Sequence, residues 1–316
     1  MQDNDKTIVI EADVSRKYAS QDNISQYMLN NNAGNGDVID RNPGPGCIIG
    51  RKYRILSTLQ DGGSSSVFIV HPLDNLSQRY VAKVMTNTVR NSSSKRFMRE
   101  AHLHSNINHP NIVKMVDYWH DDYGQYTVLE FIDGKSLKAC CSEFSFDENA
   151  ALTVAYEVAK ALRYVWNNFK IVHRDIKPEN IMVDNANYIK LLDFGISKSH
   201  NSAKETYLTM DNTILGTPGY MSPEQFINSK NVSIQSDMFS LGATIFYVIT
   251  GQVPFAGSDL AQLYRNTCEN TPPPINEYSP GLSERFIAFL NKMMQKEPEN
   301  RPASWDEVIL EIHSML

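Results

Sequence analysis

One stretch of the sequence decides the fold: His173-Arg174-Asp175-Ile176-Lys177-Pro178-Glu179-Asn180. It lies between two apolar runs, and a second stretch, Asp193-Phe194-Gly195, begins thirteen residues after Asn180. Taken alone, an Asp or Asn in a loop is usually a turn residue or a helix cap. That interpretation is insufficient here, because the two stretches occur together in a fixed order and at a fixed spacing.

These two stretches resemble the catalytic loop and the metal-binding motif of the protein kinase family. The resemblance implies an α+β protein with the two-lobed protein kinase fold, in which the N-lobe is an antiparallel sheet plus one helix and the C-lobe is mainly helical. It also implies that Asp175 orients a hydroxyl and accepts its proton, and that Lys177 offsets charge at the γ-phosphate. Asn180 and Asp193 would then bind magnesium.

A lysine in a predicted strand fits the same family. Val81-Ala82-Lys83-Val84 places an ammonium group among apolar residues, where an unpaired charge would be costly to bury. By resemblance, Lys83 holds the α- and β-phosphates of ATP, and Glu100 in the following helix is its partner. The simpler alternative for a lone lysine is a solvated surface charge.

The glycine-rich loop of the family is only partly matched. With the pattern aligned on Val67, the three glycine positions hold Gln60, Gly62 and Ser65, and Gly63 adds a glycine beside the second. A short turn between two strands would explain the glycines without any ligand. Gln60 is the departure that bears on how tightly the loop covers ATP.

The resemblance also places the adenine pocket. Leu129 is expected as the gatekeeper, and the carbonyl of Glu130 and the N–H of Ile132 are expected to pair with adenine. The residues expected to close on the two faces of the base are Leu59, Val67, Ala82 and Met182. A row of apolar residues such as this is also compatible with an ordinary core.

A further match separates protein kinases from small-molecule kinases. Gly216–Glu224 resembles the family's peptide-positioning loop, and Glu224 is expected to pair with Arg301. Asp237 is expected to brace the backbone of the catalytic loop. Lys177 and Thr217 match the serine/threonine branch of the family.

Regulation by phosphorylation is expected in the segment before this loop. In the family, the arginine that precedes the catalytic aspartate, here Arg174, reads a phosphate on the activation segment. The candidate acceptors are Thr206, Thr209 and Thr213. The alternative is that these are solvated loop hydroxyls.

The remaining sequence suggests a tail followed by one kinase domain. Residues 1–49 are rich in Asn and Asp and end in a Pro- and Gly-rich segment, so we expect a disordered tail and linker. The kinase domain is expected at 50–316, with an N-lobe at 50–131 and a C-lobe at 134–316. Expected strands are 53–59, 67–70, 80–85, 112–119 and 126–131, and expected helices are 95–108, 147–167, 260–270, 283–295 and 304–315, with a long helix centred on 240–249.

Composition excludes several other classes of protein. Lys and Arg total 30 against 36 Asp and Glu, and the net charge of −6 argues against nucleic-acid binding. The longest apolar run, 241–250, is too short to span a membrane. The 4 cysteines lack metal-ligand spacing, and the first residues carry acids and no apolar segment, so we expect a cytoplasmic protein.

Our hypothesis is a serine/threonine protein kinase that uses ATP and Mg²⁺ and acts on Ser and Thr hydroxyls of proteins, itself included. The main alternative is a pseudokinase that binds nucleotide as a scaffold, and a second is a small-molecule phosphotransferase. A possible further partner is a forkhead-associated domain, because Thr7 has an isoleucine three positions later and resembles the phosphothreonine peptides that such domains bind. A chance threonine in a solvated tail is the simpler alternative.

Overall fold

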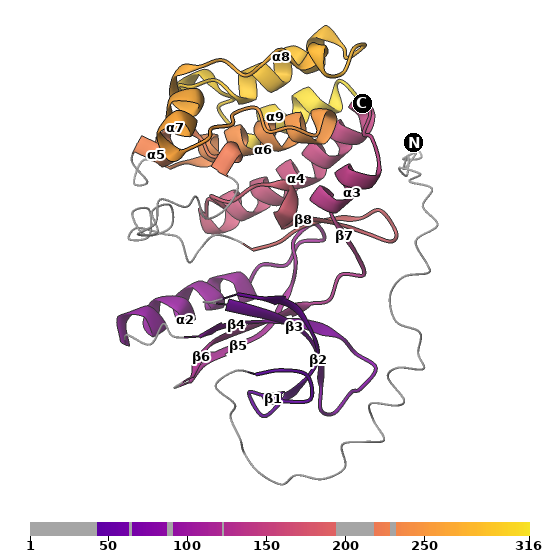
Figure 1. Ribbon diagram of the computed structural model, residues 1–316, viewed down its shortest axis with the longest axis vertical. Helices are drawn as coiled ribbons and strands as arrows, with labels where there is room; N and C mark the ends of the chain where they lie inside the picture. The colour runs from indigo at the N-terminus through magenta and orange to yellow at the C-terminus, as the bar shows by residue number, and fades with distance from the viewer. Residues whose placement is uncertain (1–42, 63–64, 87–90, 122, 194–217, 228–231) are drawn as a thin grey trace.

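The computed structural model describes residues 43–62, 65–86, 91–121, 123–193, 218–227 and 232–316. A sheet with one helix forms one end of the molecule, and a group of helices forms the other, with β7 and β8 between them (Figure 1). The predicted α+β fold with a sheet-based N-lobe and a helical C-lobe is confirmed. Among the described helices, none is long and apolar enough to cross a membrane.

The N-lobe sheet has 6 strands in the order β1-β2-β3-β4-β6-β5, and its strand pairs are antiparallel. Their bounds are β1 Ile48–Ile49, β2 Tyr53–Asp61, β3 Ser65–Pro72, β4 Tyr80–Thr86, β5 Met115–His120 and β6 Gly124–Glu130. β2 to β6 correspond to the five strands predicted from short β-rich runs. Helix α2, Asn91–Ser105, follows β4, so the predicted helix is confirmed with its bounds moved a few residues toward the N-terminus.

Regular backbone pairing begins a few residues before residue 50, the expected start of the kinase domain. β1 pairs with β2 through Ile48 and Ile49, and the backbone N–H of Gly46 donates to the carbonyl of Ile55 at 2.9 Å. The edge of β2 offers unpaired backbone groups, and pairing them while burying Ile49 outweighs the weak β-propensity of the Pro- and Gly-rich segment.

Each face of the sheet carries its own core. On one face, Ile55, Val70 and Val128 are fully buried with aromatic residues around them. On the other face, Phe97 and Ala101 of α2 pack on the apolar residues of β5 and β6. The alternation of the strand residues therefore fixes α2 on one face of the sheet.

The C-lobe is built around two long helices, α4 (Glu148–Phe169) and α6 (Ile234–Thr250). Asp147 caps α4, because its carboxylate accepts a hydrogen bond of 2.8 Å from the N–H of Ala150. α6 is buried over nearly its whole length, which explains why its sequence is apolar on all sides. The other helices are α3 Leu137–Glu143, α5 Pro223–Ile227, α7 Leu260–Glu269, α8 Glu284–Met293 and α9 Trp305–His313, and short 3-10 turns lie at Pro178–Asn180, Pro218–Tyr220, Ile275–Glu277 and Pro298–Asn300.

A small sheet carries the predicted catalytic loop. Its order is β7-β8-β9, with β7 at Gly134–Ser136, β8 at Ile181–Asp184 and β9 at Ile189–Leu191. Gly134 lies so close to β8 that an added Cβ would be 2.2 Å from the carbonyl oxygen of Val183, and a side chain there would separate the strands. The catalytic loop thus runs directly into β8, and Asp193 follows directly after β9 and Leu192.

Candidate active site

A buried carboxylate of α6 is hydrogen-bonded to the backbone of the catalytic loop. Asp237 accepts hydrogen bonds from the backbone N–H of His173 at 2.7 Å and of Arg174 at 2.8 Å. Burial raises the pKa of Asp237 to about 7, although both backbone donors favour the ionised form. The His173 ring is fully buried and contacts the carbonyl of Leu192 at 2.8 Å, which joins the loop to the segment that carries Asp193.

The side chains of Lys177 and Asn180 contact Asp175. Lys177 Nζ lies 3.1 Å from Asp175 Oδ2, and Asn180 Nδ2 donates to the same oxygen at 2.9 Å. Asn180 Nδ2 also donates to the Asp175 carbonyl at 2.8 Å. Because the amide nitrogen of Asn180 is directed at Asp175, its oxygen is the atom that can bind a cation.

Two residues of the site adopt backbone conformations that are uncommon for residues other than glycine. Arg174 has φ 69° and Asp193 has φ 36°. Such conformations cost about 1–3 kcal/mol each and persist where the surrounding structure holds them. Arg174 directly precedes Asp175, and Asp193 is itself one of the residues that the sequence assigns to chemistry.

Lys83 and Asp193 form an ion pair across the two lobes. Lys83 lies on β4, and its Nζ is 2.8 Å from Asp193 Oδ2. Burial alone would raise the pKa of Asp193, but the charge and hydrogen bond of Lys83, together with His104 and His173, hold it below its usual value. The side chains are 32% and 42% exposed, so both can still reach a ligand.

Glu100 lies on α2 and is partly buried, as expected of a residue facing the sheet. The structure gives Asp193 as the ion-pair partner of Lys83. The pair between Lys83 and Glu100 remains a prediction.

The hairpin that corresponds to the glycine-rich loop has an unexpected side-chain contact. Asp61 at the end of β2 accepts a hydrogen bond of 2.8 Å from the hydroxyl of Ser66 on β3, and the two residues are also cross-strand partners. Gln60 pairs with Val67 in the same ladder, and Gly62 follows Asp61. Gly63 lies outside the described residues. A polar contact between two strands has no periodic signal in the sequence, so only the aligned pattern could have drawn attention to Asp61.

The expected adenine residues are spread over strands β2, β3, β4, β6 and β8, and Ile132 follows β6. Ala82 is fully buried on β4 and Leu129 is buried on β6, whereas Leu59 on β2 is 55% exposed. Val67 and Met182 are partly buried, and Ile132 packs on the core between α2 and the sheet. Leu59 therefore has apolar surface that is still available for a ligand, and Ala82 and Leu129 already belong to the core.

The side chain of Glu130 has a role that the sequence did not indicate. Its Oε1 accepts a hydrogen bond from the backbone N–H of Lys114 at 2.9 Å and lies 2.7 Å from Lys190 Nζ. Lys190 is on β9, so the strand that leads out of the N-lobe is tied to the small sheet beside the catalytic loop.

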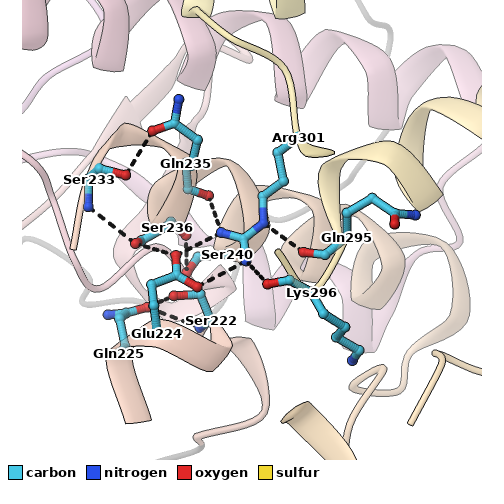
Figure 2. A network of polar contacts seen from close by, with 10 residues as sticks. All are labelled: Ser222, Glu224, Gln225, Ser233, Gln235, Ser236, Ser240, Gln295, Lys296 and Arg301. Carbon is cyan, nitrogen blue, oxygen red and sulfur yellow. Dashed lines mark hydrogen bonds and ion pairs between the residues drawn. The ribbon is translucent and has the colours of Figure 1, made fainter. Parts of the chain in front are cut away.

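Glu224 and Arg301 form the predicted pair, in a bidentate geometry of 2.7 and 2.9 Å. Figure 2 shows that the guanidinium lies at the centre of a network, because its other N–H groups donate to the carbonyls of Gln235, Gln295 and Lys296 at 2.7–2.8 Å. Burial would raise the pKa of Glu224, but the hydrogen bonds and charge of Arg301 hold it below its usual value. Every N–H of the guanidinium has an acceptor, which makes this buried pair a fixed part of the C-lobe.

Several expected site residues lie outside the described residues. They are the candidate acceptors Thr206, Thr209 and Thr213, together with Thr217 and the tail residue Thr7. Their roles remain predictions.

Comparison with known proteins agrees with this geometry. A family model described as protein kinase domain matches residues 53–311. The chain is 31% identical over 271 residues to the probable serine/threonine-protein kinase PknB of Lactococcus lactis, covering 84% of this chain and 42% of that protein. It is 31% identical over 257 residues to the serine/threonine-protein kinase PrkC of Bacillus subtilis, covering 80% and 39%. The chain thus spans about two fifths of the length of these curated relatives.

Solved structures show the same fold. The PknI kinase domain of Mycobacterium tuberculosis superposes with a TM-score of 0.67 at 20% identity, covering 87% of this chain and 98% of that one. Rad53 1–466 in complex with AMP-PNP superposes with a TM-score of 0.65 at 24% identity, covering 82% and 64%. At these identities the likeness supports the fold alone.

Proposed function

Because this chain belongs to the protein kinase domain family, we propose that it is a serine/threonine protein kinase that transfers the γ-phosphate of ATP to protein hydroxyls. The observation that carries the proposal is the joint presence of two groups of side chains. One is the cluster of Asp175, Lys177 and Asn180, and the other is the ion pair between Lys83 on β4 and Asp193 just after β9. A pseudokinase would have no need of all five residues.

The side chains fit ATP and magnesium. Asp193 supplies a carboxylate whose pKa is below its usual value, and Asn180 supplies an amide oxygen, and both are the oxygen ligands that Mg²⁺ prefers. Lys83 has three N–H donors, of which one meets Asp193, so the others can donate to phosphate oxygens. We propose that the nucleotide lies between an N-lobe at 50–131 and a C-lobe at 134–316.

Different residues of the chain have different roles in the proposed phosphoryl transfer. Bound magnesium ATP supplies the phosphoryl group and neutralises its charge. Asp175 orients the substrate hydroxyl and takes its proton on a carboxylate that Lys177 and Asn180 hold in place. Lys177 then adds positive charge beside the transferred group, and Lys83 holds the remaining phosphates. Most of the acceleration comes from positioning and electrostatics.

We also propose regulation by phosphorylation. A phosphate on Thr206, Thr209 or Thr213 would pair with Arg174, which directly precedes Asp175. Mass spectrometry after incubation with ATP should find phosphate on at least one of the three. A triple alanine variant with full activity would exclude this regulation.

Two proposals concern where and with whom the protein works. We infer a cytoplasmic protein, since the described cysteines Cys47, Cys140, Cys141 and Cys268 are all free thiols. A phosphorylated Thr7 would offer a forkhead-associated domain a tethered phosphothreonine. Measuring the binding of a peptide phosphorylated at Thr7 to forkhead-associated domains tests this proposal. Absence of phosphate at Thr7 in the active protein would exclude it.

The proposed activity is tested by incubating the protein with labelled ATP, Mg²⁺ and casein. Label should enter casein with the wild type and not with Asp175→Asn, which keeps the size of the side chain but removes the base. Equal labelling by both proteins would contradict the role of Asp175. Tight ATP binding without transfer by the wild type would favour the pseudokinase.

A further inference from the structure

Gln225 joins the segment around Glu224 to the catalytic loop. It lies on α5, directly after Glu224, and its Oε1 accepts hydrogen bonds from Ser222 N at 3.0 Å and from Ser222 Oγ at 3.1 Å. Its Nε2 donates to the backbone carbonyl of Arg174 at 3.1 Å. Both functional groups of one amide are therefore used, one within its own segment and one on a loop 51 residues away.

The carbonyl that Gln225 holds belongs to the residue directly before Asp175. The N–H of Arg174 is held by Asp237 at 2.8 Å, so hydrogen bonds fix this residue on both sides. Its φ of 69° lies in the left-handed region, which is unfavourable for a side chain with a Cβ. A backbone in that conformation relaxes unless it is held, and relaxation would turn the peptide group that leads into Asp175.

The surroundings show that Gln225 is not part of the rigid framework. The hydrogen bonds of the Arg301 guanidinium go to Glu224 and to backbone carbonyls, and the Gln225 amide is bonded instead to Ser222 and Arg174. Gln225 is only partly buried. Its removal would therefore leave the buried core in place while freeing the Arg174 carbonyl.

We propose that Gln225 is a positioning residue for phosphoryl transfer: it holds the Arg174 carbonyl and thereby sets the orientation of Asp175. Through Ser222 it makes that orientation depend on the segment 216–224, which the family resemblance assigns to positioning of the peptide substrate. The inference rests on the proposed kinase activity, and it adds a residue to which the sequence gave no role.

The test uses Gln225→Glu, which keeps the shape and the acceptor for Ser222 but replaces the N–H donor with an oxygen that repels the Arg174 carbonyl. The matched control is Gln235→Glu, a glutamine on α6 whose side chain accepts a hydrogen bond from Ser233 Oγ at 2.7 Å and can still do so as a carboxylate. Both variants receive the same change of charge within the same lobe.

The single-turnover rate of transfer to casein is measured together with the KM for ATP, the melting temperature and the stoichiometry of nucleotide binding. We expect Gln225→Glu to slow transfer about tenfold to a hundredfold. The KM for ATP and the binding stoichiometry should stay at wild-type values, since the nucleotide is held by Lys83, Asn180 and Asp193. Gln235→Glu should transfer at the wild-type rate.

Each other outcome overturns a different statement. If the wild type transfers phosphate and Gln225→Glu does so equally fast, the positioning role is wrong and the kinase activity stands. If the slower rate comes with an equal loss of binding stoichiometry, the residue supports folding and not positioning. If the wild type binds ATP without transferring phosphate, the proposed function fails, and the positioning role fails with it.

Discussion

Two of the ion pairs among the described residues, Glu224–Arg301 and Lys83–Asp193, are built in opposite ways. Arg301 is fully buried and Glu224 is 11% exposed. Arg301 also donates hydrogen bonds to three backbone carbonyls, and Glu224 also accepts one from the hydroxyl of Ser236. Lys83 and Asp193 are partly exposed and share one contact of 2.8 Å. The first pair has no capacity left for another ligand, and the second has.

This difference separates a pair that maintains structure from one that can exchange partners. A buried charge without its partner is very costly, so the Glu224–Arg301 pair must stay closed in every state of the protein. A partly exposed pair is worth little in stability, so Lys83 and Asp193 can turn toward phosphate and metal at small cost. Substitutions in the two pairs should therefore affect different measurements.

The largest effect is expected at the partly exposed pair, Lys83–Asp193. Lys83→Ala and Asp193→Ala should each lower the rate of phosphoryl transfer by at least about a hundredfold to a thousandfold. The first removes a cation proposed to hold the phosphates, and the second removes a carboxylate proposed to bind magnesium. The free energy of unfolding should change by less than about 1 kcal/mol. Transfer of labelled phosphate and denaturant unfolding measure the two quantities on the same preparations.

At the buried pair, Glu224–Arg301, substitution should lower the stability of the protein. Arg301→Ala leaves Glu224 buried without its partner, and we expect the free energy of unfolding to fall by about 3–5 kcal/mol. Arg301→Lys keeps the charge but loses the bidentate geometry, so its free energy of unfolding should lie between those of the wild type and Arg301→Ala. A denaturant titration followed by circular dichroism gives the values. A loss below about 1 kcal/mol for Arg301→Ala would mean that the network does not hold the C-lobe together.

Acid should lower the stability that the Glu224–Arg301 pair contributes, and Glu224→Gln should remove this pH dependence. The pKa of Glu224 is held below its usual value of 4.5, so the unfolded chain takes up a proton at this residue before the folded chain does. The pair's contribution is complete above about pH 4.5, and it is lost as the pH falls through the lowered pKa of the folded protein. Unfolding free energies measured between pH 6 and pH 3 should fall less steeply for Glu224→Gln, by at most about 1.4 kcal/mol per pH unit. Parallel curves for the two proteins would contradict this assignment.

The two pairs also differ in how well the sequence predicted them. Glu224 and Arg301 were predicted as partners, because motif positions identify both residues even though they lie 77 positions apart. For Lys83 the sequence predicted Glu100 as the partner, and that pair remains a prediction. The contact that the structure gives Lys83 is with Asp193, a residue 110 positions away that the sequence had assigned to the metal.

Strands with a characteristic composition were predicted well, and single polar contacts were not. The β-rich runs 80–85 and 126–131 predicted β4 and β6, because β-branched and aromatic residues suit a pleated, half-buried surface. The side-chain contacts of Gln225 and Glu130 have no such signal, since each depends on where a distant backbone group lies. The sequence therefore predicted the reacting groups but gave no indication of these two side-chain contacts.

The smallest effect is expected at a third pair that lies between the two types. Lys190 and Glu130 are 21% and 29% exposed, and their contact of 2.7 Å links β9 to β6 across the lobes. Exposed to this degree, the pair should contribute about 0–1 kcal/mol, measured as the coupling free energy of a double-mutant cycle with Lys190→Met and Glu130→Gln. The conservative changes keep the aliphatic stem of the lysine and the acceptor for the Lys114 N–H, so the cycle isolates the charge interaction. A coupling above about 2 kcal/mol would place this pair with Glu224–Arg301, and the link between the lobes would then be as rigid as the core of the C-lobe.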